Sequence, residues 1–154
     1  MVMSVEQFAA FMDTVVDEVD NDPMEEEKRD MAQEVREIQI ENFAGEADEQ
    51  GIPWQPRTRE YPHEILRETF AMHDAATTEG SGSIERIEAD GSLTTGIDGS
   101  VVPYAAIQND GSDGGKIPAR QYYFIRKNDM PRLHDLIMKG PRRVVSRHLA
   151  NHSS

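Results

Sequence analysis

A glycine-rich stretch in the second half of the chain has residue types that occur in phosphate-binding and calcium-binding loops. Its core, Gly111-Ser112-Asp113-Gly114-Gly115-Lys116, is similar to a phosphate-binding loop, but the spacing is one residue short and Ile117 replaces the required serine or threonine. A calcium loop starting at Asn109 would need an oxygen ligand in place of Gly111 and a glutamate in place of Arg120. Residues 108–116 therefore predict turns and mobility, not a nucleotide or calcium site.

The histidines and carboxylates form no catalytic or metal-binding motif. His63-Glu64 would begin a zinc-protease motif, but Arg67 occupies the place of the second histidine. A carboxylate metal cage needs histidines among its glutamates, and none precedes His63. There is no cysteine, and no serine lies in a nucleophile elbow. We predict no catalytic residue, no metal and no cofactor; a small enzyme using His73 or His63 with a carboxylate is kept as an alternative.

The composition predicts one domain with a thin core. The 154 residues are 37% hydrophobic and 6% aromatic, so either much of the chain is peripheral or other subunits complete the burial. The absence of cysteine is compatible with a reducing compartment. The N-terminus lacks a secretory signal and no window is long enough to span a membrane. We therefore expect a soluble protein, made in the cytoplasm, with no membrane partner.

Charge is distributed unevenly along the chain, whose net charge is −13. Residues 1–50 carry 16 acidic and 3 basic side chains, whereas residues 101–154 carry 4 acidic and 9 basic ones. Two interpretations stay open: two solvated faces, or head-to-tail electrostatic pairing of subunits in a ring. The acidic half also admits a different class of function, an acidic DNA mimic or a protein-binding module.

Hydrophobic periodicity predicts helices at both ends of the chain. Apolar residues at helical spacing predict a first helix over residues 5–19 and a second from Pro23 to about Phe43. A third helix is expected from near residue 128 to a break at Gly140-Pro141, and a basic helical segment follows it.

The middle of the chain predicts a small sheet with short helices around it. Trp54 should anchor a long loop, and a short helix is expected over residues 62–73. Asp90-Gly91 predicts a hairpin between strands 83–89 and 93–97, and a third strand is expected over residues 120–126. Pro103 suits the start of another short helix.

Together these elements predict an α+β fold with N-terminal helices, an antiparallel sheet of three to four strands and a C-terminal helix. We predict a single domain over residues 1–154. It would comprise an acidic helical part (1–45), a loop-rich α+β core (46–127) and a basic helical tail (128–150).

Four short motifs occur along the chain in the order Trp54-Gln55-Pro56-Arg57, Ile65-Leu66-Arg67-Glu68-Thr69, Tyr104-Ala105-Ala106-Ile107 and Ile117-Pro118-Ala119-Arg120. This order resembles the phage virion morphogenesis family, the tail-completion or neck proteins of tailed phages and prophages. The resemblance covers residues 32–126. The chain departs from the family pattern at Phe70, where glycine is frequent, at Gln108 and Asn109, where a histidine and an aromatic residue are frequent, and at Gln121, where proline is frequent.

The resemblance implies a structural virion protein at the head–tail junction that assembles as a ring, often of six subunits. It implies partners among the phage tail and neck proteins and no sequence-specific nucleic acid. The charge of the acidic N-terminal helices, by itself, suggests that they could face passing DNA without sticking to it. The protein would be made in the bacterial cytoplasm and end in the virion. The residues predicted to form assembly interfaces are Trp54, Tyr104, Lys116, Ile117, Pro118, Arg120 and Tyr122.

Overall fold

The computed structural model describes residues 5–56, 70–80 and 82–152, which fold into two compact units. One unit comprises residues 1–31 and 131–154, and the other comprises residues 32–130. The elements are α1 (Val5–Asn21), α2 (Glu25–Gly45), α3 (Ala71–Thr77), β1 (Ser83–Ile87), β2 (Leu93–Ile97), α4 (Ala105–Asp110), α5 (Met130–Ile137) and α6 (Lys139–His152). The predicted three-part single domain stays a prediction, and each unit is described by itself.

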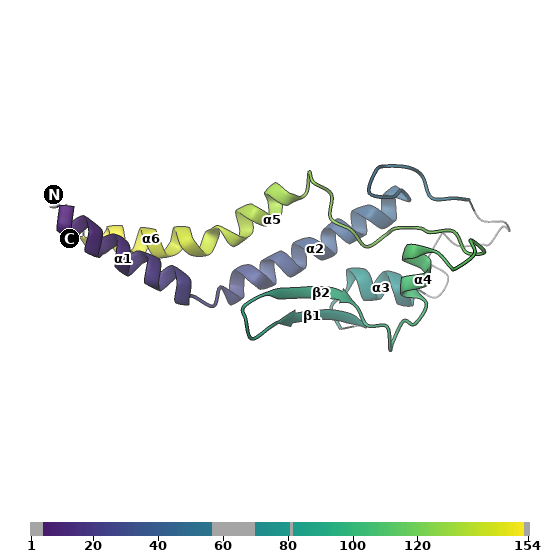
Figure 1. Cartoon of the computed structure of the whole chain (residues 1–154), viewed down its shortest axis with the longest axis horizontal. Coiled ribbons are helices and arrows are strands. Elements are labelled where there is room, and N and C mark those ends of the chain that lie inside the picture. The colour runs from purple at the N-terminus through teal and green to yellow at the C-terminus, as the bar shows by residue number, and fades with distance from the viewer. Residues whose placement is uncertain (1–4, 57–69, 81, 153–154) are drawn as a thin grey trace. The chain divides into compact units, whose positions relative to one another are not determined.

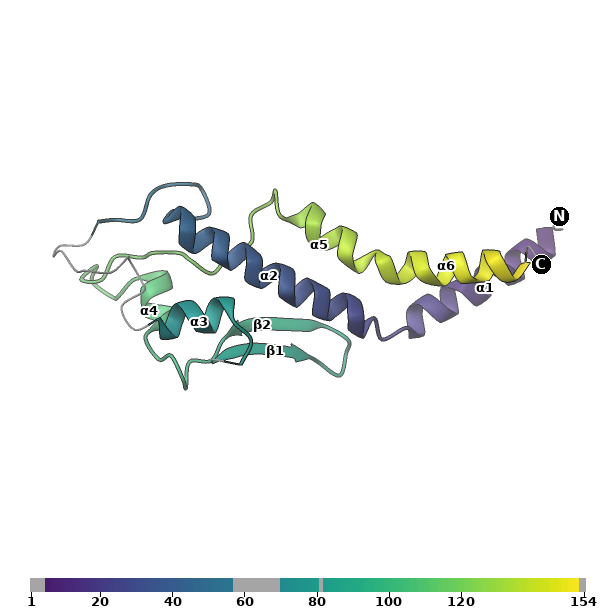
Figure 2. The same cartoon turned by 180° about the vertical axis from the view of Figure 1, so that it is seen from behind.

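In the first unit, α1 and α6 lie side by side and antiparallel, as Figures 1 and 2 show from opposite sides. Val15 and Val144, with 5% and 0% of their surface exposed, are buried within this unit. The ring of Phe11 meets the His148 ring edge-on, with 6.1 Å between centroids. The helix predicted from the apolar spacing of residues 5–19 is therefore confirmed as α1, although many of its apolar side chains are exposed.

The junction between α1 and α2 is a tight turn built by Asp22. Its Oδ1 accepts a hydrogen bond from the backbone N–H of Met24 at 2.9 Å. The helix therefore begins at Glu25, two residues after the predicted start at Pro23. This N–H and the Arg143 guanidinium hold the pKa of Asp22 below its usual range.

The predicted helix break in the tail lies at Met138, between α5 and α6, and not at Gly140-Pro141. Pro141 falls in the first turn of α6, where a missing N–H costs no intrahelical hydrogen bond. Gly140 packs against the start of α2, because a Cβ there would lie 3.3 Å from Met24 Cγ and 3.4 Å from Glu27 Cδ.

The second unit contains the predicted hairpin, in which β1 and β2 pair antiparallel with Ser83 opposite Ile97 and Ile87 opposite Leu93. Asp90 caps the turn through Oδ1, which accepts from the N–H of Ser92 at 2.9 Å and from its hydroxyl at 2.7 Å. Helix α3 packs on both strands. The predicted helix over residues 62–73 falls mostly outside the described residues.

The predicted third strand is not found among the described residues, where the sheet has two strands. Side-chain amides take the place of a neighbouring strand for residues 122–124. Asn42 Nδ2 donates to the Phe124 carbonyl at 2.9 Å and to the Tyr122 carbonyl at 3.3 Å. Gln39 Oε1 accepts from the Phe124 N–H at 3.3 Å. The segment therefore satisfies its backbone against α2 without joining the sheet.

The core of this unit is an aromatic cluster between α2, α3 and α4. Its buried members are Phe43, Trp54, Met72, Ala75, Ala76, Val102, Ala105 and Tyr122. The Phe43 ring contacts Tyr122 with 5.2 Å between centroids, and meets Trp54 edge-on at 6.2 Å. These large rings supply much of the apolar burial in a chain of few aromatics.

Replacing Asn42 by alanine should lower the free energy of unfolding of the second unit by about 1–3 kcal/mol, because two backbone carbonyls lose a buried donor. Urea denaturation followed by the fluorescence of Trp54, the sole tryptophan, measures this unit directly. Glu37→Ala, an exposed change on the same helix, should stay within about 0.5 kcal/mol of wild type. Equal effects of the two changes would contradict the assigned role of Asn42.

Candidate assembly surfaces

Three of the seven predicted interface residues are buried within the chain itself. Trp54 is 6% exposed, and its Nε1 donates to the Gln121 carbonyl at 2.9 Å. Tyr122 is 2% exposed, and its hydroxyl donates to the Ala105 carbonyl at 3.0 Å. Burial raises the pKa of this phenol well above its usual range. Arg120, 9% exposed, donates to the Gln55 carbonyl through Nε and Nη2 at 3.4 and 3.3 Å.

These contacts join the first, third and fourth family-like motifs around one point. Gln55 follows the Trp54 anchor, Ala105 belongs to the motif that opens α4, and Arg120 ends the fourth motif. Sequence order alone did not predict that they touch. Whether Trp54, Arg120 and Tyr122 also contact a neighbouring subunit stays a prediction.

The base of the glycine-rich loop is closed by a set of local hydrogen bonds. Asn109 Oδ1 accepts from the N–H groups of Tyr122 and Tyr123 at 3.2 and 3.3 Å. The Arg120 N–H donates to the Gln108 carbonyl at 2.9 Å. Gln108 and Asn109 depart from the family pattern, yet both hold the base of this loop. Gln108 does so through its backbone carbonyl, and Asn109 through its side-chain oxygen.

Gly111 lets the two arms of the loop approach each other. Its φ is +84°, and an added Cβ would lie 3.0 Å from the Ala119 nitrogen and 3.2 Å from the Ile117 oxygen. Ser112 bridges the arms further, since its Oγ accepts from the Ile117 N–H at 2.8 Å and its own N–H donates to the Ile117 carbonyl at 3.0 Å. The loop is therefore anchored at its base, and its predicted mobility applies at most to the tip.

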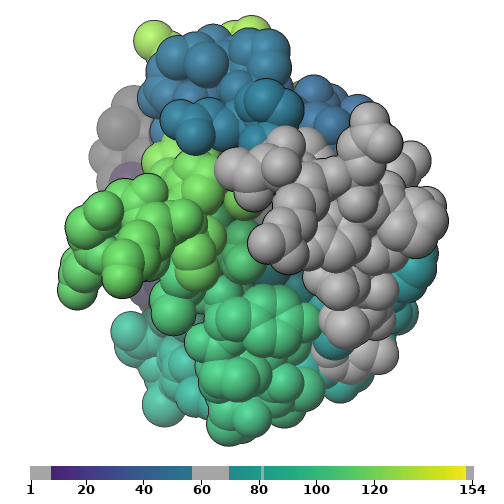
Figure 3. Space-filling view, turned by 90° about the vertical axis from the view of Figure 1, so that its right-hand side faces the viewer, coloured from purple at the N-terminus to yellow at the C-terminus, as the bar shows by residue number. Residues whose placement is uncertain are grey.

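The accessible part of the predicted interface lies around this loop. Lys116 is exposed, Ile117 and Pro118 are half-buried, and Tyr104 is 39% exposed. In Figure 3 the loop, in bright green, protrudes from the surface next to the α4 region below it. Ile107, 44% exposed on α4, adds an apolar side chain nearby in sequence. The exposed aromatic ring of Tyr104 and the neighbouring apolar side chains suit a contact with another protein.

The charge asymmetry of the sequence is partly satisfied within the first unit. Arg143 binds Glu27 at 2.6 Å and Asp22 at 3.0 Å, and Lys139 binds Asp30 at 2.8 Å. Nearer the chain ends, Arg147 and His148 both bind Glu18. Acidic and basic segments thus pair inside one chain, an arrangement that neither sequence interpretation contained.

Among the described residues, no three His, Cys, Asp or Glu side chains converge to hold a metal ion. His73 contacts Asp74 at 3.2 Å, but its ring packs on Phe43 with 5.0 Å between centroids. A hollow between α2, α3 and the hairpin has a cavity volume of about 10 Å³ and is lined in part by Arg36 and Glu85, which pair with each other. This volume has room for about one water molecule and is far below the roughly 300 Å³ at which small-molecule sites begin.

No helix in the described part of the chain combines the length and apolarity needed to cross a bilayer.

Gln39, Asn42 and Asn109 are the functional side chains that the sequence interpretation missed. Gln39 and Asn42 are fully buried, yet they lie between the apolar residues Ile38 and Phe43 of α2. The sequence did contain a signal for Gln39 and Asn42, because they lie among apolar residues of a predicted helix. A buried amide must find hydrogen-bond partners, so this position predicts a structural contact.

The change Gly111→Ala should destabilise the second unit by about 1–3 kcal/mol more than Gly114→Ala does. Both glycines have φ above +80°. Gly111 also has ψ 169°, a combination essentially restricted to glycine, so its alanine variant carries this backbone strain in addition to the close contacts. Only Gly111 also has backbone atoms within 3.4 Å of the added Cβ, whereas Gly114 has nothing within 4 Å. Urea denaturation measures the difference, and equal losses would show that the arms of the loop do not approach closely.

Replacing Arg143 by methionine should lower the melting temperature of the first unit more than Arg142→Met does, because the Glu27 carboxylate, 3% exposed, loses its cation. Arg142→Met is the matched control, since Arg142 is 63% exposed and lies 3.8 Å from Asp135. Helical circular dichroism during thermal unfolding reports both. A control as damaging as Arg143→Met would mean that loss of helix propensity or solubility, not pairing, decides the result.

No curated protein and no solved structure matches the chain. The phage virion morphogenesis family matches residues 3–140, which is nearly the whole chain and extends well beyond the resemblance seen over residues 32–126. The protein therefore belongs to the phage virion morphogenesis family.

Proposed function

We propose that this protein is a structural component of the head–tail junction of a tailed phage, acting in tail completion or as part of the neck. The observation that carries the proposal is membership of a virion morphogenesis family over nearly the whole chain. Among the described residues no three side chains converge on a metal ion, which is compatible with a role in assembly. The protein would be made in the host cytoplasm and incorporated into the virion.

In this proposal subunits associate as a ring, with six copies as the number that the family resemblance implies. The surface around Lys116, Ile117 and Pro118 would contact a neighbouring subunit or another tail or neck protein. A loop with an anchored base and an exposed tip can order its tip on binding while losing little further backbone freedom.

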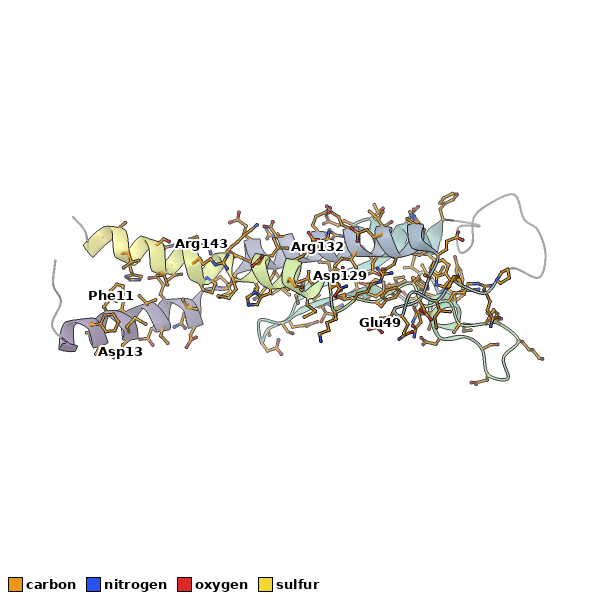
Figure 4. All side chains as sticks on the ribbon, turned by 90° about the horizontal axis from the view of Figure 1, so that it is seen from above. Phe11, Asp13, Glu49, Asp129, Arg132 and Arg143 are labelled. Carbon is orange, nitrogen blue, oxygen red and sulfur yellow. The ribbon has the colours of Figure 1, made fainter. Side chains whose placement is uncertain are left out.

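The acidic outer side of α1 would face DNA passing through the ring. Asp13, Asp17 and Asp20 are exposed, and Figure 4 shows Asp13 pointing away from α6. Like charge on the passage would keep DNA from sticking, because duplex DNA carries about one negative charge per 1.7 Å of its axis.

Inactivating the gene in the phage or prophage that encodes it tests this role. Electron microscopy of the lysate should show filled heads and separate tails in place of joined particles, and the wild-type gene supplied in trans should restore infectious particles. Lysates with normal joined particles that lack this protein would overturn the proposal. Competition between the purified protein and DNA for a basic host protein would instead favour the DNA-mimic alternative.

A further inference from the structure

Two rows of exposed apolar side chains run along the first unit. On α1, Phe8, Met12 and Val16 are 54%, 40% and 49% exposed and follow each other at intervals of four residues. On α6, Val145 and Leu149 are 38% and 53% exposed at the same interval. Intervals of four place each row on one side of its helix.

The two rows lie on the same side of the helix pair. The side chains between the helices include Phe11 and Val15 on α1 and Val144 and His148 on α6; Figure 4 shows Phe11 in the space between the helices. Each exposed row follows these contact residues by one position, a rotation of about 100° around its helix axis. Because the helices are antiparallel, equal right-handed rotations turn both rows to one side, and together they form a single apolar face.

The edges of this apolar face carry opposite charges. Helix α1 contains acidic and no basic residues, and the exposed carboxylate of Asp20, four residues after Val16, lies on its outer edge. Helix α6 contains basic and no acidic residues, and Arg142, which is 63% exposed, lies on the other edge. A surface with an apolar centre, one acidic edge and one basic edge is complementary to itself after a two-fold rotation.

We propose that this apolar face is covered by a second copy of the chain, so that two α1–α6 pairs form a four-helix bundle. The two-fold axis runs parallel to the helices, which places each α1 between the α6 of its own chain and the α6 of its partner. The other two-fold arrangement, with its axis across the helices, would set α1 on α1 and bring like charges together. Charge complementarity therefore selects the first arrangement.

The interaction goes beyond the proposed role at the head–tail junction and does not rest on it. It concerns residues of the first unit only, whereas the surface around the glycine-rich loop belongs to the second unit. The pairing would exist in the purified protein, before any contact with other virion parts.

Cysteine cross-linking tests the arrangement directly, because the natural chain has no cysteine. A Val16→Cys chain is mixed with a Leu149→Cys chain and oxidised; the pairing of Glu18 with His148 places positions 16 and 149 at the same level of the bundle. The mixture should give a disulfide-linked dimer, and Val16→Cys alone should give much less, because the two α1 helices lie diagonally opposite. Asp17→Cys mixed with Ser146→Cys, exposed positions off the apolar face, is the background control.

Sedimentation equilibrium over a concentration series supplies the second readout. The double variant Met12→Gln with Leu149→Gln should raise the dissociation constant of the dimer by about tenfold or more, with unchanged helix content. A ring-sized mass in place of a dimer overturns the two-fold pairing even if the 16–149 cross-link forms, because a cyclic ring joins its subunits through head-to-tail contacts. A wild-type protein that stays monomeric throughout, or a mixture that cross-links no better than the control, overturns it. Neither result bears on the head–tail role, which the particle-joining experiment decides.

Discussion

The first unit depends on one constraint, that a buried carboxylate must keep its cation. Glu27 is almost completely inaccessible, and Arg143 on α6 supplies its charge partner at 2.6 Å while also binding Asp22. Without this pair the desolvation of Glu27 would oppose the packing of the last helix on the beginning of α2. Because α1 contains no basic residue and α6 no acidic one, the same pairing of opposite charges repeats toward the chain ends through Glu18. The strong acidity of the first fifty residues is therefore partly used inside the molecule.

In the second unit, the backbone groups of residues 122–124 need hydrogen-bond partners because this segment does not join the sheet. Asn42, Gln39 and Asn109 provide the hydrogen bonds, and the aromatic cluster supplies the apolar burial. The result is an anchored base for a glycine-rich loop whose tip is exposed. Membership of the phage virion morphogenesis family supports a structural role in the virion.

The sequence predicted correctly those helices and strands that are determined by neighbouring residues, such as a turn dipeptide or a helical apolar spacing. Asp90-Gly91 specified the hairpin, and the apolar spacing of residues 5–19 specified α1. The third strand over residues 120–126 was wrong, because its aromatic propensity is satisfied by packing on Phe43 and its backbone by amides more than eighty residues distant in sequence. The pairing of the two charged ends was missed for the same reason. Composition reveals opposite charges but not whether they meet within a chain or between chains, which only the fold decides.

The most direct test of this account is a spin-label distance measurement between positions 17 and 146, with labels on Asp17→Cys and Ser146→Cys of one chain diluted into an excess of unlabelled protein. Pairing of α1 with α6 inside one chain predicts a single narrow distance distribution that survives the dilution. A signal that disappears on dilution would mean that the acidic and basic helices pair between chains. A broad distribution would mean that they do not pair, and either result would contradict the account.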